Sequence, residues 1–179
     1  KPSSAASDVY KRQEQTLLRT VETIWKVKFE PGWGAPTERV VMERLVPLNE
    51  SADPGVRYYS GAATYETTLD VPRQWLKKGQ AMTLDLGEVR EFATVTLNGK
   101  TLPVQWKPPY AVDVTEVLKP GRNILSVRVV NFWANRMIGD QQPGAKPLTF
   151  APIQPFKADD PLMKSGLLGP VTLKRTESR

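Results

Sequence analysis

The chain has 179 residues, with 25 Lys or Arg against 19 Asp or Glu, which gives a formal net charge of +6 at pH 7. It contains no cysteine and no histidine, so a disulfide framework, a thiolate metal site and serine–histidine catalysis within the chain are excluded. No apolar run is long enough to span a bilayer, and 16 prolines with 12 glycines indicate many short strands and turns, not a helical bundle.

The first residues are polar and differ from the rest of the chain. Residues 1–22 are predicted to be a linker or a short helical lead-in, because "DVYKRQEQTLLRTVE" is weakly helical. The start has no apolar region of a signal peptide and no initiating Met, so we expect a mature or excised piece. Residues 23–179 are predicted to form one β-sandwich domain.

Alternating apolar residues identify the central strands. Period-two alternation runs through residues 63–69, 82–86, 93–97 and 125–129, and each segment is bounded by Gly, Pro or Asn. The pair Asn98-Gly99 predicts a tight hairpin, since both central residues of a type I′ turn need positive φ.

The strand pattern predicts an all-β fold. About eight short strands with many Pro and Gly breaks favour an antiparallel β-sandwich. Residues 132–169 are expected to be a long irregular excursion before a final strand in "GPVTLKR". A late strand after such an excursion suits a jelly roll, in which the last strand pairs with an early one.

A set of motifs in the middle of the chain resembles the sugar-binding domain of glycoside hydrolase family 2, a galactose-binding-like jelly roll. The segments that carry the resemblance are the "VTLNGK" hairpin, the aromatic–proline bend "WKPPY", "DVT", the "LKPGRN" turn and the strand end "VVN". Further segments resemble the version of this domain in bacterial α-L-rhamnosidase-type enzymes of family 106, namely "FEPGWGAP", "SADPGVRYYSG", "NFWANRMIGD" and "SGLLGPVTL".

The resemblance implies a non-catalytic module of a larger, secreted or periplasmic bacterial glycoside hydrolase. In such enzymes the catalytic carboxylates lie in a separate barrel domain, which the β-sandwich supports. The implied partners are that catalytic domain of the same polypeptide and a polysaccharide or oligosaccharide. No cofactor is required, although the resemblance allows a structural calcium, for which Asp53, Asp159 and Asp160 are candidate ligands.

Five residues are candidates for carbohydrate binding, because sugars are bound by flat apolar faces together with a few polar side chains. Trp33 lies in a Gly/Pro-rich loop, where it either binds sugar or caps the sandwich. Trp106 and Tyr110 form either a stacking platform or an aromatic–proline packing contact. Arg136 and Asp140 form either an internal ion pair or a ligand contact.

Neighbours of that last pair are assigned structural roles. Asn131 ends a strand and is expected to tie its side chain to a nearby loop, while Trp133 and Met137 are expected to fill the core beneath the excursion. Catalysis by the chain itself is disfavoured, since its carboxylate candidates lie on turns where such groups usually face water. These candidates are Glu88, Glu91, Asp113, Asp159 and Asp160.

Two functional hypotheses follow. The first is binding of a plant-type polysaccharide, acidic or pectic because of the positive charge, by a shallow site around Trp33. The second is a purely structural sandwich that packs on the catalytic barrel through an exposed apolar patch. The positive charge is scattered and no nucleic-acid-binding motif occurs, so neither nucleic acid nor a membrane is an expected partner.

Overall fold

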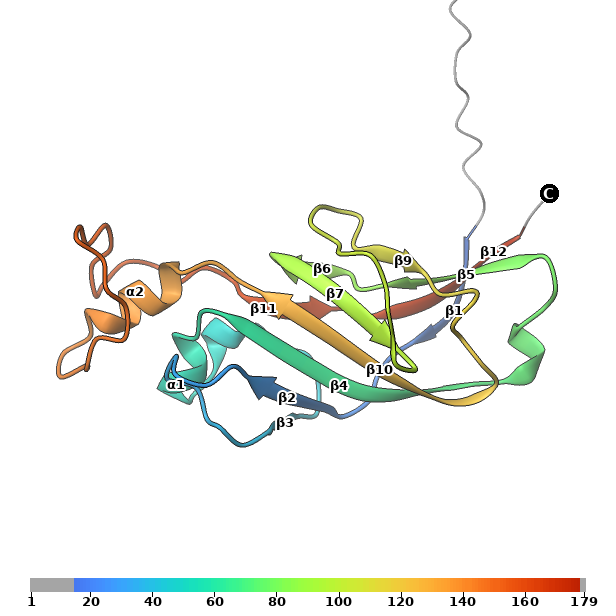
Figure 1. The fold of residues 1–179 in the computed structure, drawn as a ribbon, viewed down its shortest axis with the longest axis horizontal. Coiled ribbons are helices and arrows are strands. Elements are labelled where there is room, and N and C mark those ends of the chain that lie inside the picture. Colours follow the sequence, from blue (N-terminus) through green and yellow to red (C-terminus); the bar gives the residue numbers. More distant parts are fainter. Residues whose placement is uncertain (1–14, 178–179) are drawn as a thin grey trace, which may run out of the picture.

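The computed structural model describes residues 15–177, which form an antiparallel β-sandwich with four short helices (Figure 1). The strands are β1 (Gln15–Thr20), β2 (Trp25–Phe29), β3 (Val40–Met42), β4 (Ala62–Val71), β5 (Gln80–Asp85), β6 (Glu88–Arg90), β7 (Phe92–Leu97), β8 (Lys100–Thr101), β9 (Ala111–Asp113), β10 (Gly121–Val130), β11 (Gly166–Gly169) and β12 (Thr172–Glu177). The helices are the 3₁₀ turns η1 (Leu48–Glu50) and η2 (Arg73–Trp75) and the α-helices α1 (Pro54–Arg57) and α2 (Ala134–Asp140).

The strands form two main sheets and a small third one. The six-stranded sheet has the order β3-β2-β4-β10-β7-β8, the four-stranded sheet has the order β1-β12-β5-β9, and β11 pairs with β6. Strand β12 pairs with β1 and with β5, so the last strand of the chain joins an early one. The predicted antiparallel β-sandwich with a returning final strand is confirmed.

The core consists of the side chains that the alternation pattern pointed inward. The large aromatic residues Trp25, Tyr59 and Tyr65 are 1%, 0% and 0% exposed, so they fill the space between the sheets. The alternating positions that are buried with them are Ala63, Leu69, Met82, Leu84, Leu86, Ala93, Val95, Leu97, Leu125, Val127 and Val129. Burial of this apolar surface is the main stabilising term of the sandwich.

The first described residues correct one prediction. Gln15–Thr20 form strand β1, so the predicted helical lead-in is wrong for this part, while residues 1–14 of that segment lie outside the described residues. Strand β1 is the edge strand of its sheet and pairs with β12 only. An edge strand with exposed residues such as Leu17 shows little alternation, and its pairing with a distant strand outweighs its local propensity.

A buried asparagine, Asn123, closes the turn between β9 and β10 and binds the Asn98-Gly99 hairpin between β7 and β8. Asn98 and Gly99 have φ of 52° and 84°, as the predicted tight hairpin requires. The Asn98 side chain donates to Asn123 Oδ1 at 2.7 Å, and the fully buried Asn123 also accepts from Lys119 N at 3.0 Å. Asn123 Nδ2 donates to the carbonyl oxygens of Lys119 and Gly121, both at 2.8 Å, so this one side chain closes the turn.

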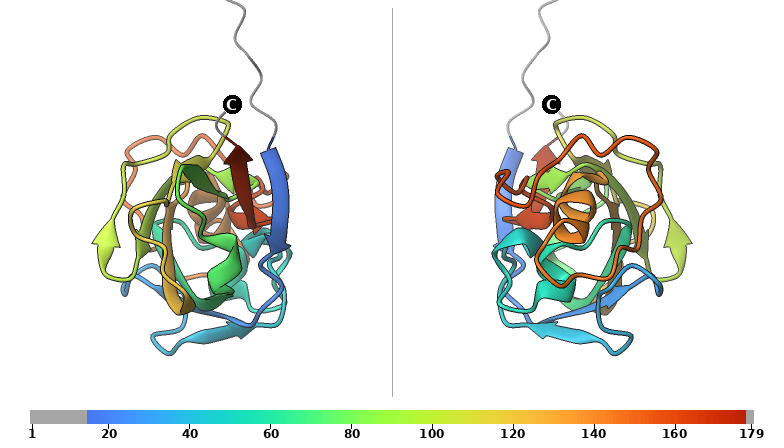
Figure 2. Two further views of the ribbon diagram at one scale, coloured as in Figure 1. Left: turned by 90° about the vertical axis from the view of Figure 1, so that its right-hand side faces the viewer. Right: turned by 90° about the vertical axis from the view of Figure 1, so that its left-hand side faces the viewer.

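The sandwich has two distinct ends. Strand β1 and the last described residues of β12 lie side by side at one end, whereas α1 and α2 gather at the other (Figure 1). Viewed along the long axis, α2 lies in front of the strands at that second end (right panel of Figure 2). We refer to this region, formed by α1, α2 and residues 141–165, as the α2 end.

The asparagine turn generates a prediction about stability. Replacing Asn123 by Ala removes the side chain that binds the Lys119 backbone N–H, two backbone carbonyls and the Asn98 amide, which then keeps only its bond to Val117 O. We expect Asn123→Ala to lower the free energy of unfolding by about 3 kcal/mol, measured by urea denaturation. Ser126→Ala, on the same strand but turned outward, is the control and should change it by less than about 0.5 kcal/mol. Equal losses in the two variants would contradict this role.

Candidate functional site

Asn131 fixes the start of the α2 end. Its side-chain oxygen accepts from Gly61 N at 2.7 Å, and its Nδ2 donates to Tyr59 O at 3.0 Å. The predicted tie from this strand end to a neighbouring loop is confirmed. The Tyr59 hydroxyl in turn donates to Ala62 O at 2.7 Å, and burial raises the pKa of Tyr59 to about 12, so this group remains a neutral donor at physiological pH.

Helix α2 follows directly and is held by contacts with distant residues. Asn135 exchanges two hydrogen bonds with the backbone of Met163, at 2.7 and 2.8 Å, and Arg136 N donates to Ser60 Oγ at 3.1 Å. Gly139 packs so closely on Tyr58 that a Cβ at Gly139 would lie 2.6 Å from the Tyr58 side chain. The sequence pattern predicted irregular chain here, because seven residues with a glycine and no capping side chain carry little helical signal.

Arg136 and Asp140 form an internal ion pair. Arg136 Nε donates to Asp140 Oδ1 at 3.0 Å, and the two side chains are 8% and 0% exposed. The other carboxylate oxygen accepts from Thr149 N at 2.8 Å and from Thr149 Oγ1 at 2.5 Å. Asp140 therefore links α2 to the middle of the excursion.

The charge state of Asp140 follows from its partners. Burial alone raises the pKa of a carboxyl group, but the hydrogen bonds from Thr149 and Leu148 and the Arg136 charge outweigh it. The pKa of Asp140 is consequently held below its ordinary value. The carboxylate stays ionised, so it accepts bonds from both the helix and the excursion.

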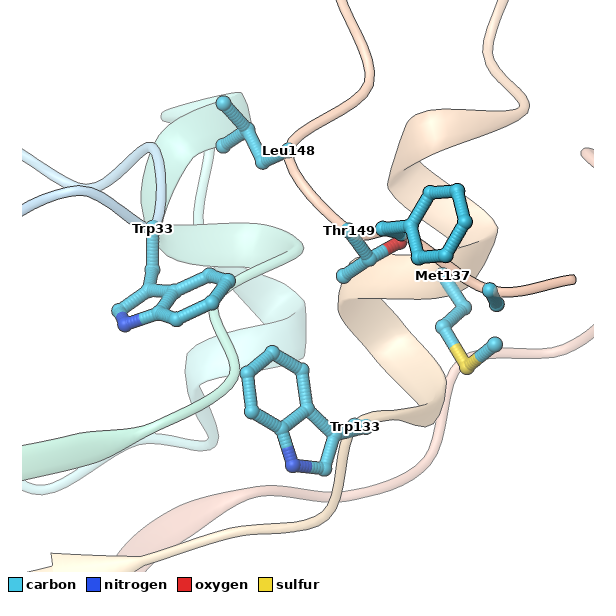
Figure 3. Close-up of a pocket in the computed structure, with 7 residues that line it drawn as sticks. Trp33, Trp133, Met137, Leu148 and Thr149 are labelled. Carbon is cyan, nitrogen blue, oxygen red and sulfur yellow. The ribbon is translucent and has the colours of Figure 1, made fainter.

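Trp33 and Trp133 line an apolar hollow at the α2 end (Figure 3). Their rings meet edge to face, with centroids 4.6 Å apart and an interplanar angle of 80°. The hollow has a volume of about 270 Å³, and its other lining residues are Met137, Leu148, Thr149, Phe150 and Ala151. Trp133 is 48% exposed, so the prediction that it fills the core is wrong: the preceding turn directs its ring toward Trp33.

Large apolar side chains are exposed in the lining of this hollow and at positions close in sequence to it. Phe150 is 96% exposed and Ile153, three residues later, is 79% exposed. Phe132 and Leu148 are 50% and 39% exposed. We call Phe132, Trp133, Leu148, Phe150 and Ile153 the apolar surface. Exposure of this kind marks interaction sites in soluble proteins.

Trp106 and Tyr110 do not form a platform. Trp106 is 63% exposed, with Lys107 Nζ 5.0 Å from its ring centroid, whereas Tyr110 is 7% exposed and belongs to the core. Tyr110 stands immediately before β9 and packs under the sheet, where burial raises its pKa. A buried ring has no free face, so of the two alternatives drawn from the sequence the two-ring stacking platform is not formed, and only Trp106 remains accessible.

Three of the five carboxylates considered for catalysis have local hydrogen-bond partners. Glu88 accepts from Arg90 at 2.8 Å, and Asp113 accepts from Thr115 N and Oγ1 at 2.9 and 2.6 Å. Asp160 accepts from Lys157 N at 2.8 Å. Among residues 15–177, no group of three or more His, Cys, Asp or Glu is placed to hold a metal ion. A structural calcium stays a prediction.

The fold defines the chain as a galactose-binding-like β-sandwich domain. Residues 39–158 match the family described as "Glycosyl hydrolase 2 galactose-binding domain-like", and the chain belongs to this family. The predicted resemblance to the galactose-binding-like domain of glycoside hydrolases is thus confirmed. None of the helices formed by residues 15–177 is long and apolar enough to cross a membrane.

Solved structures and a curated relative agree with this assignment. A rhamnosidase from Novosphingobium sp. PP1Y is 41% identical with a TM-score of 0.88, covering 96% of this chain and 16% of that chain. A β-glucuronidase from an uncultured Clostridium sp. is 27% identical with a TM-score of 0.65, covering 91% of this chain and 29% of that chain. A putative β-glucuronidase of Formosa agariphila is 34% identical over 173 residues, 83% of this chain and 15% of the relative.

The chain thus spans less than a third of each of these proteins, 16% in the rhamnosidase, 29% in the Clostridium enzyme and 15% in the Formosa relative. The predicted similarity to the domain in rhamnosidase-type enzymes is confirmed by the first of them.

The buried ion pair generates a prediction about stability. Asp140→Ala removes the partner of a buried guanidinium and the acceptor of two hydrogen bonds that Thr149 donates. We expect it to lower the free energy of unfolding by about 3 to 5 kcal/mol, measured by urea denaturation. The double variant Arg136→Met/Asp140→Leu should lose less, since no charge is left unpaired. A single-variant loss below about 1 kcal/mol would refute the role of the pair.

The lowered pKa of Asp140 predicts that the stability of the fold depends on pH. The pKa of Asp140 is lower in the folded than in the unfolded chain, so its contribution to stability is complete above the unfolded value of about 4. The contribution is lost as the pH falls through the folded pKa. The stability difference between the wild type and Asp140→Asn, from denaturation at pH 7 to pH 2.5, should therefore shrink below about pH 4. A difference that stays constant over this range would contradict the assignment.

Proposed function

We propose that this chain is a non-catalytic domain of a larger bacterial glycoside hydrolase, and that its apolar surface packs on the catalytic domain of the same polypeptide. Membership of the galactose-binding-like family and the small share of each relative that the chain spans support a domain of this kind. The sequence led to two hypotheses, polysaccharide binding and packing on the catalytic barrel. At the apolar surface we favour packing on the barrel.

The observation that carries the proposal is the exposure of Phe150 next to a fixed residue. Phe150 is 96% exposed, while the preceding Thr149 is bound to Asp140 through both its backbone N–H and its hydroxyl. The backbone at this point is therefore held in place and directs a large apolar ring into solvent. A phenylalanine presented in this way gains free energy when another surface covers it.

The polar groups around the hollow favour a protein partner over a sugar. A sugar site needs polar side chains for the hydroxyl groups beside its flat apolar faces. Thr149 lines the hollow, but its N–H and hydroxyl are occupied by Asp140. The remaining lining consists of apolar side chains, which suit an apolar side chain of a neighbouring domain.

Carbohydrate binding at the same hollow is the second candidate. The edge-to-face pair of Trp33 and Trp133 is the observation that favours it, because tryptophan faces pack on the C–H groups of sugar rings. Under this alternative the ligand is a plant-type polysaccharide, acidic or pectic in the hypothesis drawn from the sequence. The two candidates are distinguished by what protects the hollow. Carbohydrate binding predicts protection by isolated sugars, and docking predicts protection by the catalytic domain.

The wider role follows from the proposed parent enzyme. We assign catalysis to a separate domain, where two carboxylates stand about 5 to 9 Å apart, and a secreted or periplasmic location to the whole. The names of the relatives, a rhamnosidase and β-glucuronidases, support a polysaccharide or oligosaccharide substrate for the parent. The chain alone should show no hydrolysis of aryl rhamnosides or aryl glucuronides in a chromogenic assay, and activity that survives repurification would refute the non-catalytic role.

Packing on the catalytic domain predicts a specific protection pattern. Hydrogen exchange is compared between the 179-residue chain and the full polypeptide to which we assign it. Residues 148–153 should exchange at least tenfold more slowly in the full polypeptide, because covered backbone amides open less often. Added oligosaccharide should not reproduce this protection in the isolated chain; if it does, the sugar-binding alternative holds.

Matched variants test the same surface in the full polypeptide. Phe150→Asp with Ile153→Asp should abolish the protection and lower the melting temperature, since burying two charges against apolar residues is unfavourable. Ile124→Asp is the control, because Ile124 is 62% exposed on β10 and lies outside the apolar surface. Equal behaviour of the pair and the control would exclude docking through the apolar surface.

A further inference from the structure

A second hollow lies on the other side of Leu148 from the tryptophan pair. It has a volume of about 330 Å³, and the lining residues that bear on its chemistry are Gly55, Tyr58, Arg136, Gln142, Lys146 and Leu148. Leu148 also lines the tryptophan hollow, so the two hollows adjoin at this residue. The volume is at the lower end of small-molecule pockets, which suits a single sugar ring.

Arg136 lines this hollow, and its guanidinium lies between glycines. A Cβ on Gly34 would lie 2.9 Å from Nη1, and a Cβ on Gly139 would lie 2.5 Å from Nη2. Gly55, which lines the hollow, packs directly on the Gly34 carbonyl. Positions without side chains thus leave the room that the guanidinium occupies.

Most of the donors of this guanidinium are unused. Within residues 15–177 its only hydrogen bond is the one from Nε to Asp140 Oδ1, because Asp140 Oδ2 is occupied by Thr149. The Arg136 side chain is only 8% exposed. Its Nη atoms have no hydrogen-bond partner within residues 15–177, but they are not fully enclosed. Buried donors are normally satisfied, so the Nη groups are available to an acceptor in the hollow.

The remaining lining specifies the acceptor. The planar fork of two Nη groups matches a carboxylate, with two parallel charge-assisted hydrogen bonds. Lys146 adds a second positive charge, while Asp140 compensates only one of the two. Tyr58 offers a half-buried aromatic face, and Gln142, whose Nε2 donates to Ile138 O and Ala158 O, keeps its Oε1 as an acceptor for a hydroxyl.

We propose that this hollow binds a sugar that carries a carboxylate, a uronate, with the carboxylate on the Arg136 Nη groups and the ring against Tyr58. This site differs from the tryptophan hollow, and the proposal does not depend on docking to a catalytic domain. It gives Arg136 a ligand-binding role in addition to its internal ion pair, and it assigns Asp140 a positioning role only.

Titration of the 179-residue chain with monosaccharides tests the proposal. D-galacturonate and D-glucuronate are compared with D-galactose, D-glucose and acetate by NMR chemical-shift perturbation. At least one uronate should bind at least tenfold more tightly than its neutral counterpart and than acetate, since only the uronate supplies both the carboxylate and the ring. Its affinity should fall as the salt concentration rises.

Three variants locate the binding. Arg136→Lys keeps the charge but removes the fork, and it should weaken uronate binding by about tenfold or more. Ala145→Phe, in the loop that lines the hollow, should block binding without touching the ion pair, and it keeps the test valid if Arg136→Lys fails to fold. Ile124→Ala alters an exposed residue on β10 that does not line the hollow and should leave binding unchanged.

Four outcomes would overturn the proposal. The first is equal affinity for the uronates and the neutral sugars. The second is acetate binding as tight as uronate binding, which would indicate a site for any carboxylate, such as an acidic side chain of another domain. The third is uronate binding that survives Ala145→Phe. The fourth is the absence of binding by both uronates at tens of millimolar.

Discussion

The buried ion pair between Arg136 and Asp140 is the interaction on which the whole α2 end depends. A helix of seven residues is too short to be stable alone, so α2 exists because tertiary contacts hold it. Asp140 then connects the helix to Thr149 across the excursion, with both carboxylate oxygens in use. This connection separates an apolar hollow lined by two tryptophans from a hollow in which the Arg136 donors are unused.

The sandwich beneath is a conventional scaffold, and the chemistry lies at one of its ends. The strands bury alternating side chains between two sheets, and a single buried asparagine closes a turn. A fold of this kind supports many functions, so family membership alone does not identify a ligand. The functional candidates all come from connecting segments, which a rigid sheet can vary without loss of its core.

Sequence patterns predicted the scaffold better than the site. Strand alternation, the Asn98-Gly99 hairpin and the tie made by Asn131 were confirmed, because each depends on local geometry or on a strand end. Trp133 was assigned wrongly and Tyr110 was left open between two roles, since burial of an aromatic residue in a loop depends on the path of the loop. Strand β1 was missed because its pairing partner lies at the other end of the chain.

The sequence by itself determined the all-β class, the positions of the central strands and the absence of histidine and cysteine chemistry, because period-two burial and residue content are local properties. It left Arg136 and Asp140 as either an ion pair or a ligand contact. Only the tertiary structure showed that they form an ion pair and that the guanidinium also borders a hollow. The reason is physical: which donors of a buried side chain remain free depends on residues outside its helix, such as Thr149 and Gly34, whose positions the local pattern does not give.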